Sequence, residues 1–170
     1  EGKSYPMGQH GFARDMEFSV KSEKDGEVWF SLKSDEETMK KYPFAFCLEL
    51  GYRLNGNSLD VLWRVINEDI KEMHFSIGGH PAFMCPLNGE GEQTDYYIAF
   101  DSEKDLEYSV LNENGLVAIE GEALATQGGM LPIDAGLFDR DALIIEGKQA
   151  KKVSLCDGNK KPYLSVAKTD

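Results

Sequence analysis

Apolar and polar residues alternate with a period of two along most of this 170-residue chain. Such alternation is typical of β-strands that bury one face. In the first half of the chain the pattern predicts strands over residues 12–20, 28–32, 44–54, 58–66 and 71–77. The Lys-Asp-Gly-Glu run at residues 24–27 predicts a turn between the first two strands. The Asn-Gly-Asn run at residues 55–57 predicts a tight hairpin between the next pair.

The second half of the chain continues the same pattern in shorter pieces. It predicts strands over residues 96–100, 106–111, 116–119, 143–145, 152–156 and 163–166. Residues 126–138 contain several glycines and a proline, which indicates a long loop. Residues 34–41 are polar and begin with Ser34 followed by acidic residues, which fits either a capped helical turn or a long hairpin connection.

No segment of ten residues keeps a convincing helical period, so many short strands with turn signals remain the main pattern. The fold class that this predicts is all-β, as an antiparallel sandwich or barrel. No repeat, low-complexity tract or composition change marks a domain boundary. We therefore expect residues 1–170 to form a single domain.

The composition indicates a soluble globular protein, with 41% hydrophobic and 28% charged residues. The formal net charge of −12 repels phosphate, so we expect neither nucleic acid nor a membrane surface as a partner. No transmembrane helix or signal peptide fits the sequence. Cys47, Cys85 and Cys156 are scattered and lack metal-ligand spacing, which favours a reduced, cytoplasmic protein with no metal site. The oligomeric state stays open.

Both ends of the chain look like cuts through a longer polypeptide. Residue 1 is Glu, the first motif follows within ten residues, and the chain stops directly after the apolar run at residues 163–166. We expect a fragment from the middle of a longer protein, with a processed terminus as the alternative.

Two short motifs place a histidine beside glycine and close to a phenylalanine. His10 opens a His-Gly-Phe-Ala-Arg run, and His80 stands within Gly-His-Pro-Ala-Phe at residues 79–83. Histidine titrates near neutral pH, so a pair of histidines in a cleft could move protons. The glycines allow close approach, and the aromatic rings could offer an apolar face to a ligand. The structural alternatives are a surface-loop histidine for His10 and a core histidine for His80.

An acidic segment near the end of the chain offers hydrogen-bond acceptors. Asp139 and Asp141 flank Arg140, and either carboxylate could accept hydrogen bonds from sugar hydroxyls. The alternative is a solvated acidic loop. Arg14 and Asp15 could form a local ion pair of little energetic weight. No phosphate-binding loop or dinucleotide fingerprint is present, so the sequence predicts no cofactor.

These motifs, in this order, resemble the galactose mutarotase-like superfamily, and most closely its bacterial aldose 1-epimerase-related branch. That branch carries His-Gly-Phe-Ala-Arg, here residues 10–14, and then Gly-His-Pro-Ala/Gly-Phe, here residues 79–83. Its Phe-x-x-Asp-Ala-Leu segment is similar to residues 137–143. The resemblance implies a large antiparallel β-sandwich with an open sugar-binding cleft. It also implies that this chain is an incomplete, central portion of that sandwich.

The resemblance implies that the protein is an isomerase of carbohydrate metabolism. Such an aldose 1-epimerase, or mutarotase, interconverts the α and β anomers of an aldohexose such as galactose or glucose by acid/base ring opening, without a cofactor. His80 would be the general acid, and His10 would bind or polarise the sugar near the ring oxygen. Asp141, with Asp139 as its rival, would accept hydrogen bonds from the sugar. Further substrate contacts are expected from Arg14 and Phe83.

The base of the family reaction has no match in this chain. The family base is a glutamate in a strand near the C-terminus, beyond residue 170, and Glu146 lies ahead of the last two predicted strands in a different context. A chain without the base should catalyse poorly, because proton transfer by a positioned group contributes about 10²–10⁴-fold. The alternatives are a carbohydrate-binding β-sandwich without turnover and a structural β-domain whose histidines are incidental.

Overall fold

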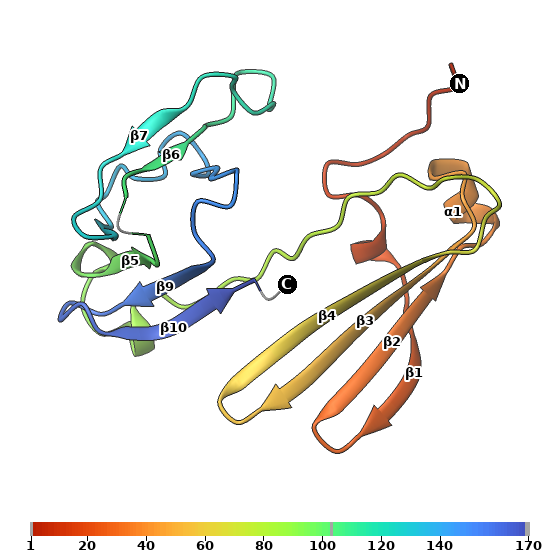
Figure 1. The fold of residues 1–170 in the computed structure, drawn as a ribbon, viewed down its shortest axis with the longest axis horizontal. Coiled ribbons are helices and arrows are strands. Elements are labelled where there is room, and N and C mark those ends of the chain that lie inside the picture. The colour runs from red at the N-terminus through yellow and green to blue at the C-terminus, as the bar shows by residue number, and fades with distance from the viewer. Residues whose placement is uncertain (1, 103, 169–170) are drawn as a thin grey trace. The chain divides into compact units, whose positions relative to one another are not determined.

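The computed structural model describes residues 2–102 and 104–168, which consist mainly of strands and extended segments (Figure 1). The chain divides into two compact units, Glu1–Gly79 and His80–Asp170. Each unit has its own antiparallel sheet and its own cluster of buried apolar residues. Along the described residues, no helix is both long and apolar enough to cross a membrane.

The first unit is built on a four-stranded antiparallel sheet in the order β1-β2-β3-β4 (Figure 1). A short 3₁₀ turn, Ala13–Asp15, precedes the sheet. The strands are β1 (Ser19–Lys24), β2 (Glu27–Lys33), β3 (Phe46–Asn55) and β4 (Ser58–Asn67), with the helix α1 (Glu36–Lys41) between β2 and β3.

The tight hairpin turn predicted for the first unit is confirmed. Asn55 pairs with Ser58 across the β3–β4 hairpin, so residues 56–57 form the two-residue turn that the sequence predicts. Of the two alternatives for residues 34–41, the capped helical turn is correct. The Asp35 carboxylate caps α1 by accepting hydrogen bonds from the backbone N–H groups of Glu37 and Thr38.

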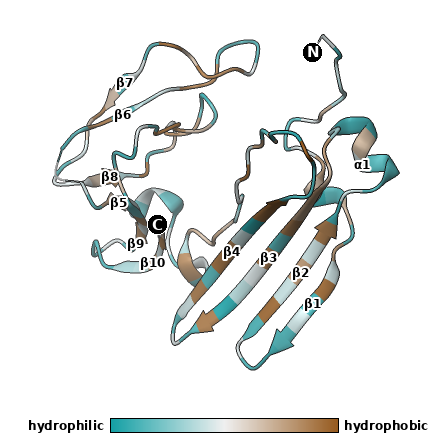
Figure 2. Cartoon of the chain, turned by 45° about the vertical axis from the view of Figure 1, so that its right-hand side comes forward, coloured by the Kyte–Doolittle hydropathy of each residue, from teal (hydrophilic) through white to brown (hydrophobic). Residues whose placement is uncertain are grey.

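One face of this sheet carries a continuous apolar surface. The register aligns Leu32, Leu48 and Val65 across neighbouring strands. The alternation along the strands is visible as brown bands in Figure 2. The α1 end of this face is buried around Leu32, Phe46 and Leu48. The apolar residues that pack against that cluster include Phe12, Ala13, Met16, Phe18, Tyr42 and Met73. Towards the hairpin end, Leu54, Leu59 and Val61 are exposed.

Two predicted strands of the first unit are wrong. In residues 12–20, the strand begins only at Ser19, and the earlier part forms the 3₁₀ turn. A left-handed Gly11, with φ of 70°, lies just before the turn, and Phe12 and Met16 pack on the core from there. Residues 71–77 alternate as predicted but join no strand in the described part of the chain. Of their alternating apolar residues, Met73 packs on the core, whereas Phe75 and Ile77 are exposed.

The second unit holds a four-stranded antiparallel sheet in the order β10-β9-β5-β8 and a separate β6–β7 hairpin. The 3₁₀ turns Leu87–Gly89 and Gln93–Asp95 precede the sheet. The strands are β5 (Tyr97–Phe100), β6 (Leu106–Tyr108), β7 (Glu122–Leu124), β8 (Met130–Pro132), β9 (Lys152–Cys156) and β10 (Pro162–Ala167). Leu106, Leu124 and Leu131 are the buried centre of this unit.

Several elements of the second unit differ from the prediction. The strand predicted over residues 106–111 ends at Tyr108. Residues 116–119 and 143–145 contribute only isolated bridges, at Val117 and Ile144. Residues 126–138 are not one loop, because they contain β8, which pairs with β5. The β7 strand was not predicted, since its Glu-Ala-Leu sequence is too short to show alternation.

Candidate functional site

The first histidine motif forms a tight turn anchored by its phenylalanine. The backbone N–H of Gly11 donates to the carbonyl oxygen of Gly8 at 3.0 Å, with His10 exposed within that turn. The Phe12 ring packs towards Phe46 with a centroid distance of 6.0 Å. The aromatic anchor thus fixes the backbone that presents His10.

Arg14 lies one turn further along, also at the surface. Its Nε donates to Asp15 Oδ1 at 3.4 Å, and both side chains are more than half exposed. This is the local ion pair expected from the sequence, and exposed pairs of this kind add little stability. The guanidinium is therefore oriented only weakly by its neighbour.

The second histidine motif lies in an extended segment where Gly79 ends the first unit and His80 begins the second. His80 and Phe83 are both exposed, the latter at 44%. Tyr163 on β10 donates its hydroxyl to the carbonyl oxygen of Met84 at 2.9 Å. Burial raises the pKa of Tyr163 to about 12, with a further contribution from Cys85, so the phenol remains a donor at neutral pH. A β10 side chain thus anchors the backbone just after the motif.

His10 belongs to the first unit and His80 to the second. The pairing of the two histidines in one cleft stays a prediction. The third histidine, His74, presents its backbone carbonyl to the Tyr42 hydroxyl at 2.6 Å. That contact belongs to the packing of the first unit.

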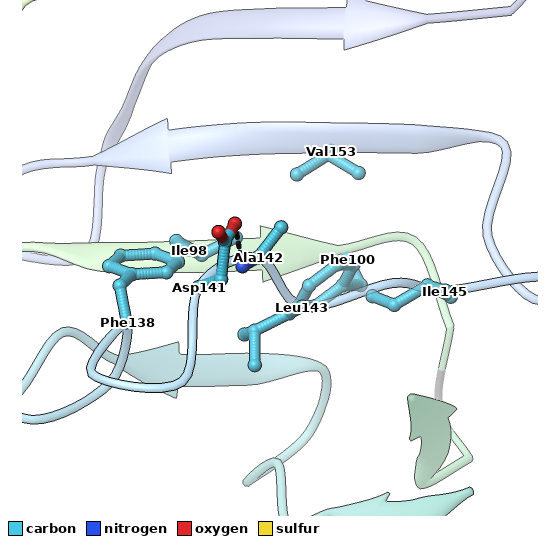
Figure 3. A pocket seen from close by; sticks show the side chains of 8 residues that line it. All are labelled: Ile98, Phe100, Phe138, Asp141, Ala142, Leu143, Ile145 and Val153. Carbon is cyan, nitrogen blue, oxygen red and sulfur yellow. Dashed lines mark hydrogen bonds between the residues drawn. The ribbon is translucent and has the colours of Figure 1, made fainter. Parts of the chain in front are cut away.

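The structure distinguishes the two candidate aspartates of the second unit. Asp141 lines an open hollow of ≈ 710 Å³, as Figure 3 shows. The other residues that line this hollow are apolar: Ile98, Phe100, Phe138, Ala142, Leu143, Ile145 and Val153. Asp139 is turned back over its own turn, where its Oδ2 would lie 3.3 Å from a Cβ on Gly136. Of the two carboxylates, only that of Asp141 borders the hollow.

Asp141 has a left-handed backbone, with φ of 71°. Aspartate adopts this conformation more readily than most residues, because its short side chain can hydrogen-bond locally. Here Oδ1 of Asp141 accepts a hydrogen bond from the backbone N–H of Ala142 at 2.7 Å (Figure 3). The carboxylate is therefore held against the rim of the hollow by its own chain.

Sequence reasoning missed a cluster of three side chains, which consists of Arg140, Glu122 and Tyr108. Arg140 Nη1 donates to Glu122 Oε1 at 2.6 Å, and Nη2 donates to Glu122 Oε2 at 2.7 Å. Nη2 also donates to the Tyr108 hydroxyl at 2.7 Å, which in turn donates to Glu122 Oε2 at 2.9 Å. The hydrogen bonds from Arg140, and then from Tyr108, lower the pKa of Glu122 to about 2. The only sequence signal was an arginine between two aspartates.

Metal ligation has no support in the geometry. Within the described ranges, no group of three or more His, Cys, Asp or Glu side chains is arranged to hold a metal ion. The three cysteines are unpaired, and Cys47 and Cys156 are buried. Burial raises the pKa of both buried thiols, so they remain protonated and act as small core residues.

Comparison with known proteins agrees with the fold and with the family resemblance. A family model described as aldose 1-epimerase matches residues 1–157. The chain belongs to the aldose 1-epimerase family. Two curated relatives are the plasmid and chromosomal forms of Protein LacX from Lactococcus lactis subsp. lactis, each 32% identical over 151 residues. The match covers 86% of this chain and 50% of each relative, so the chain spans about half their length.

Solved structures show the same fold. A galactose mutarotase related enzyme from Lactobacillus acidophilus is 32% identical with a TM-score of 0.84, over 92% of this chain and 52% of that one. A galactose mutarotase-like protein from Lactobacillus casei ATCC 334 is 33% identical with a TM-score of 0.78, over 92% of this chain and 54% of that one. The galactose mutarotase-like antiparallel β-fold expected from the sequence is confirmed.

Proposed function

We propose that this chain carries part of the sugar site of a mutarotase, which interconverts the α and β anomers of an aldohexose such as galactose or glucose. The observation that carries the proposal is the family match over residues 1–157, because this range includes every candidate residue. The apolar hollow bordered by Asp141 adds support. Sugar sites combine apolar surface for the ring with a few polar groups for its hydroxyls.

In this proposal the candidate residues have separate roles. His80 protonates the ring oxygen as the anomeric hydroxyl gives its proton to the family's glutamate base, which has no match within residues 1–170. His10 polarises the sugar near the ring oxygen. The C1–ring oxygen bond then breaks, and rotation followed by reclosure gives the other anomer. Histidine suits such proton transfer because its ordinary pKa lies near neutrality.

Recognition of the sugar falls to residues around the reacting atoms. Asp141 accepts hydrogen bonds from ring hydroxyls, and its contact with the hollow favours it over Asp139 for this role. Arg14 and Phe83 are exposed and supply further sugar contacts. The three unpaired thiols support a cytoplasmic location for the reaction.

A second candidate is sugar binding without turnover. It is favoured by the hollow itself, whose lining combines one carboxylate with apolar residues and includes no histidine. Glu146 is exposed in the loop before β9, where its carbonyl oxygen accepts a hydrogen bond from Gln149 at 2.8 Å. It therefore does not occupy the strand context that the family base requires.

Exchange between sugar anomers tests the proposal directly. In the protein at its full natural length, His80→Ala should slow mutarotation of galactose or glucose by about 10²–10⁴-fold, the usual contribution of a positioned acid. The matched control is His74→Ala, which removes an exposed histidine whose structural contact is made by its backbone. Polarimetry measures both rates. An unchanged rate in His80→Ala would overturn the assignment, and calorimetric sugar binding without any rate enhancement in the parent protein would favour the second candidate.

A further inference from the structure

Arg140 connects the candidate sugar-binding segment to a different part of the second unit. Its side chain extends to the β6–β7 hairpin, where Tyr108 lies on β6 and Glu122 lies on β7. Both terminal nitrogens of the guanidinium donate to the Glu122 carboxylate, and one of them also donates to the Tyr108 hydroxyl. This planar, two-pronged contact fixes direction as well as distance.

The backbone on either side of Arg140 is held by apolar packing. Leu137 and Leu143 both pack against the buried cluster of the second unit. Between them, the N–H of Asp141 donates to the carbonyl oxygen of Phe138 at 3.1 Å, which closes a tight turn. Arg140 is the residue of this turn whose side chain reaches the hairpin, while the next residue, Asp141, borders the hollow.

We propose that Arg140 is a positioning residue, which holds the turn against Glu122 and Tyr108 so that the Asp141 carboxylate faces the hollow and can receive sugar hydroxyls. The role in sugar recognition rests on the proposed function. The positioning itself is a property of the chain without any ligand.

Charge alone does not account for this role. Glu122 engages both terminal nitrogens of Arg140, so the arginine charge is already compensated within the cluster. The two flanking aspartates therefore receive little direct neutralisation from it. A lysine would restore the charge but not the two-pronged geometry, because an ammonium is a compact point charge on a flexible stem. Arg140→Lys should consequently rescue only part of the effect.

The first experiment reads the positioning without sugar, by NMR of the chain. In the parent, a strong intraresidue NOE between the amide and Hα protons of Asp141 should report a left-handed residue, and the Ala142 amide proton should be shifted downfield by its hydrogen bond to the Asp141 carboxylate. In Arg140→Gln we expect both signatures to be lost. The control is Arg53→Gln, which removes a similarly exposed arginine from the Glu27 pair in the first unit. Unchanged signatures at Asp141 and Ala142 in Arg140→Gln would overturn the inference.

The second experiment reads the consequence for sugar, in the full-length protein. Arg140→Gln should raise the KM for the aldohexose roughly tenfold, the range of a hydrogen bond to a charged group, and leave kcat within about twofold. The KM of Arg140→Lys should lie between those of the parent and of Arg140→Gln. On an Asp141→Ala background, Arg140→Gln should add little, because both changes remove the same contact.

The NMR and kinetic experiments distinguish failure of the positioning role from failure of the proposed function. A fall in kcat with unchanged KM, or full additivity with Asp141→Ala, would overturn the positioning role in recognition. If the parent protein neither binds nor converts any aldohexose, the proposed function fails, and the NMR arm still decides whether Arg140 positions Asp141.

Discussion

At the scale of single residues, the packing of the Trp29 ring requires that residue 51 has no side chain. A Cβ on Gly51 would lie 2.7 Å from Trp29 Cε2, well inside van der Waals contact. The Trp29 ring is also held by its Nε1, which donates to Glu27 at 2.7 Å, and by Arg64, whose guanidinium lies 5.2 Å from the ring centroid. The indole therefore covers Gly51 in one defined position.

Gly51→Ala should lower the free energy of unfolding by about 1–3 kcal/mol, because the added methyl group must displace a held aromatic ring. Urea unfolding at neutral pH measures the change. Gly78→Ala is the control, since nothing lies within 4 Å of a Cβ there and no positive φ is involved. Equal stability of Gly51→Ala and the parent would contradict the packing described.

The low pKa of Glu122 predicts a pH-dependent contribution to stability. Because Arg140 lowers the pKa of this carboxyl from 4.5 to about 2, the stabilisation is complete above the unfolded value and is lost as the pH falls towards 2. The stability difference between the parent and Glu122→Gln should therefore be largest near neutral pH and shrink between pH values of about 4.5 and 2. Urea unfolding of both proteins at several pH values checks this, and a difference that grows on acidification would refute it.

At the scale of elements, the helix α1 depends on its first residues. The Asp35 carboxylate accepts hydrogen bonds from the N–H groups of Glu37 at 3.0 Å and Thr38 at 2.8 Å. The Thr38 hydroxyl accepts one from the N–H of Asp35 at 2.8 Å, which completes a capping box. A helix as short as Glu36–Lys41 has few internal hydrogen bonds, so the cap carries much of its stability.

Asp35→Ala should destabilise the chain by about 1 kcal/mol, the usual effect of removing an N-cap acceptor. Asp35→Asn retains an acceptor oxygen and should lose much less. Thermal unfolding of the two variants distinguishes them. If both lose the same stability, charge at the helix start matters more than the hydrogen bonds.

The elements that the sequence predicted well are those with explicit turn chemistry. The β3–β4 hairpin follows from Asn55 and Gly56, and the β1–β2 turn follows from Gly26. Residues 71–77 were misread because alternation reports which side chains are buried and carries no information on whether a neighbouring strand exists. Strands as short as β7 leave too few residues for any periodicity.

The candidate site divides in the same way between local motifs and long-range contacts. Short motifs suggest His10, His80 and Asp141 as site residues because each motif is local in the sequence, and their roles stay predictions. The contacts of Arg140 join residues 18 and 32 positions apart, and nothing in the local pattern selects those partners. Long-range polar contacts arise from the packing of the hairpin, which the sequence pattern did not specify.

At the scale of the whole molecule, the chain combines a net charge of −12 with an apolar sheet surface that is partly exposed. Leu54, Leu59 and Val61 are 65%, 56% and 48% exposed on one face of the first unit's sheet. Contiguous apolar patches of this kind bind apolar dyes, whereas single exposed apolar residues do not.

We expect this chain to enhance the fluorescence of anilinonaphthalene sulfonate and Val61→Lys to reduce the enhancement, because the substitution puts a charge into the patch. Ile70→Lys is the control, since Ile70 is fully exposed in the loop that follows β4 and is not part of the sheet. Circular dichroism confirms that both variants keep their strands. An equal loss of dye binding in the two variants would mean that the sheet face is not the dye site.

At Asp141, the backbone conformation and the position of the side chain favour different residues. Glycine adopts a φ of 71° with less strain than aspartate, so glycine would favour folding stability at this position. A glycine would also abolish the acceptor that borders the hollow. Aspartate therefore keeps a carboxylate at the hollow in a backbone conformation that glycine would adopt more easily, so any ligand contact made by this carboxylate comes at the expense of folding stability.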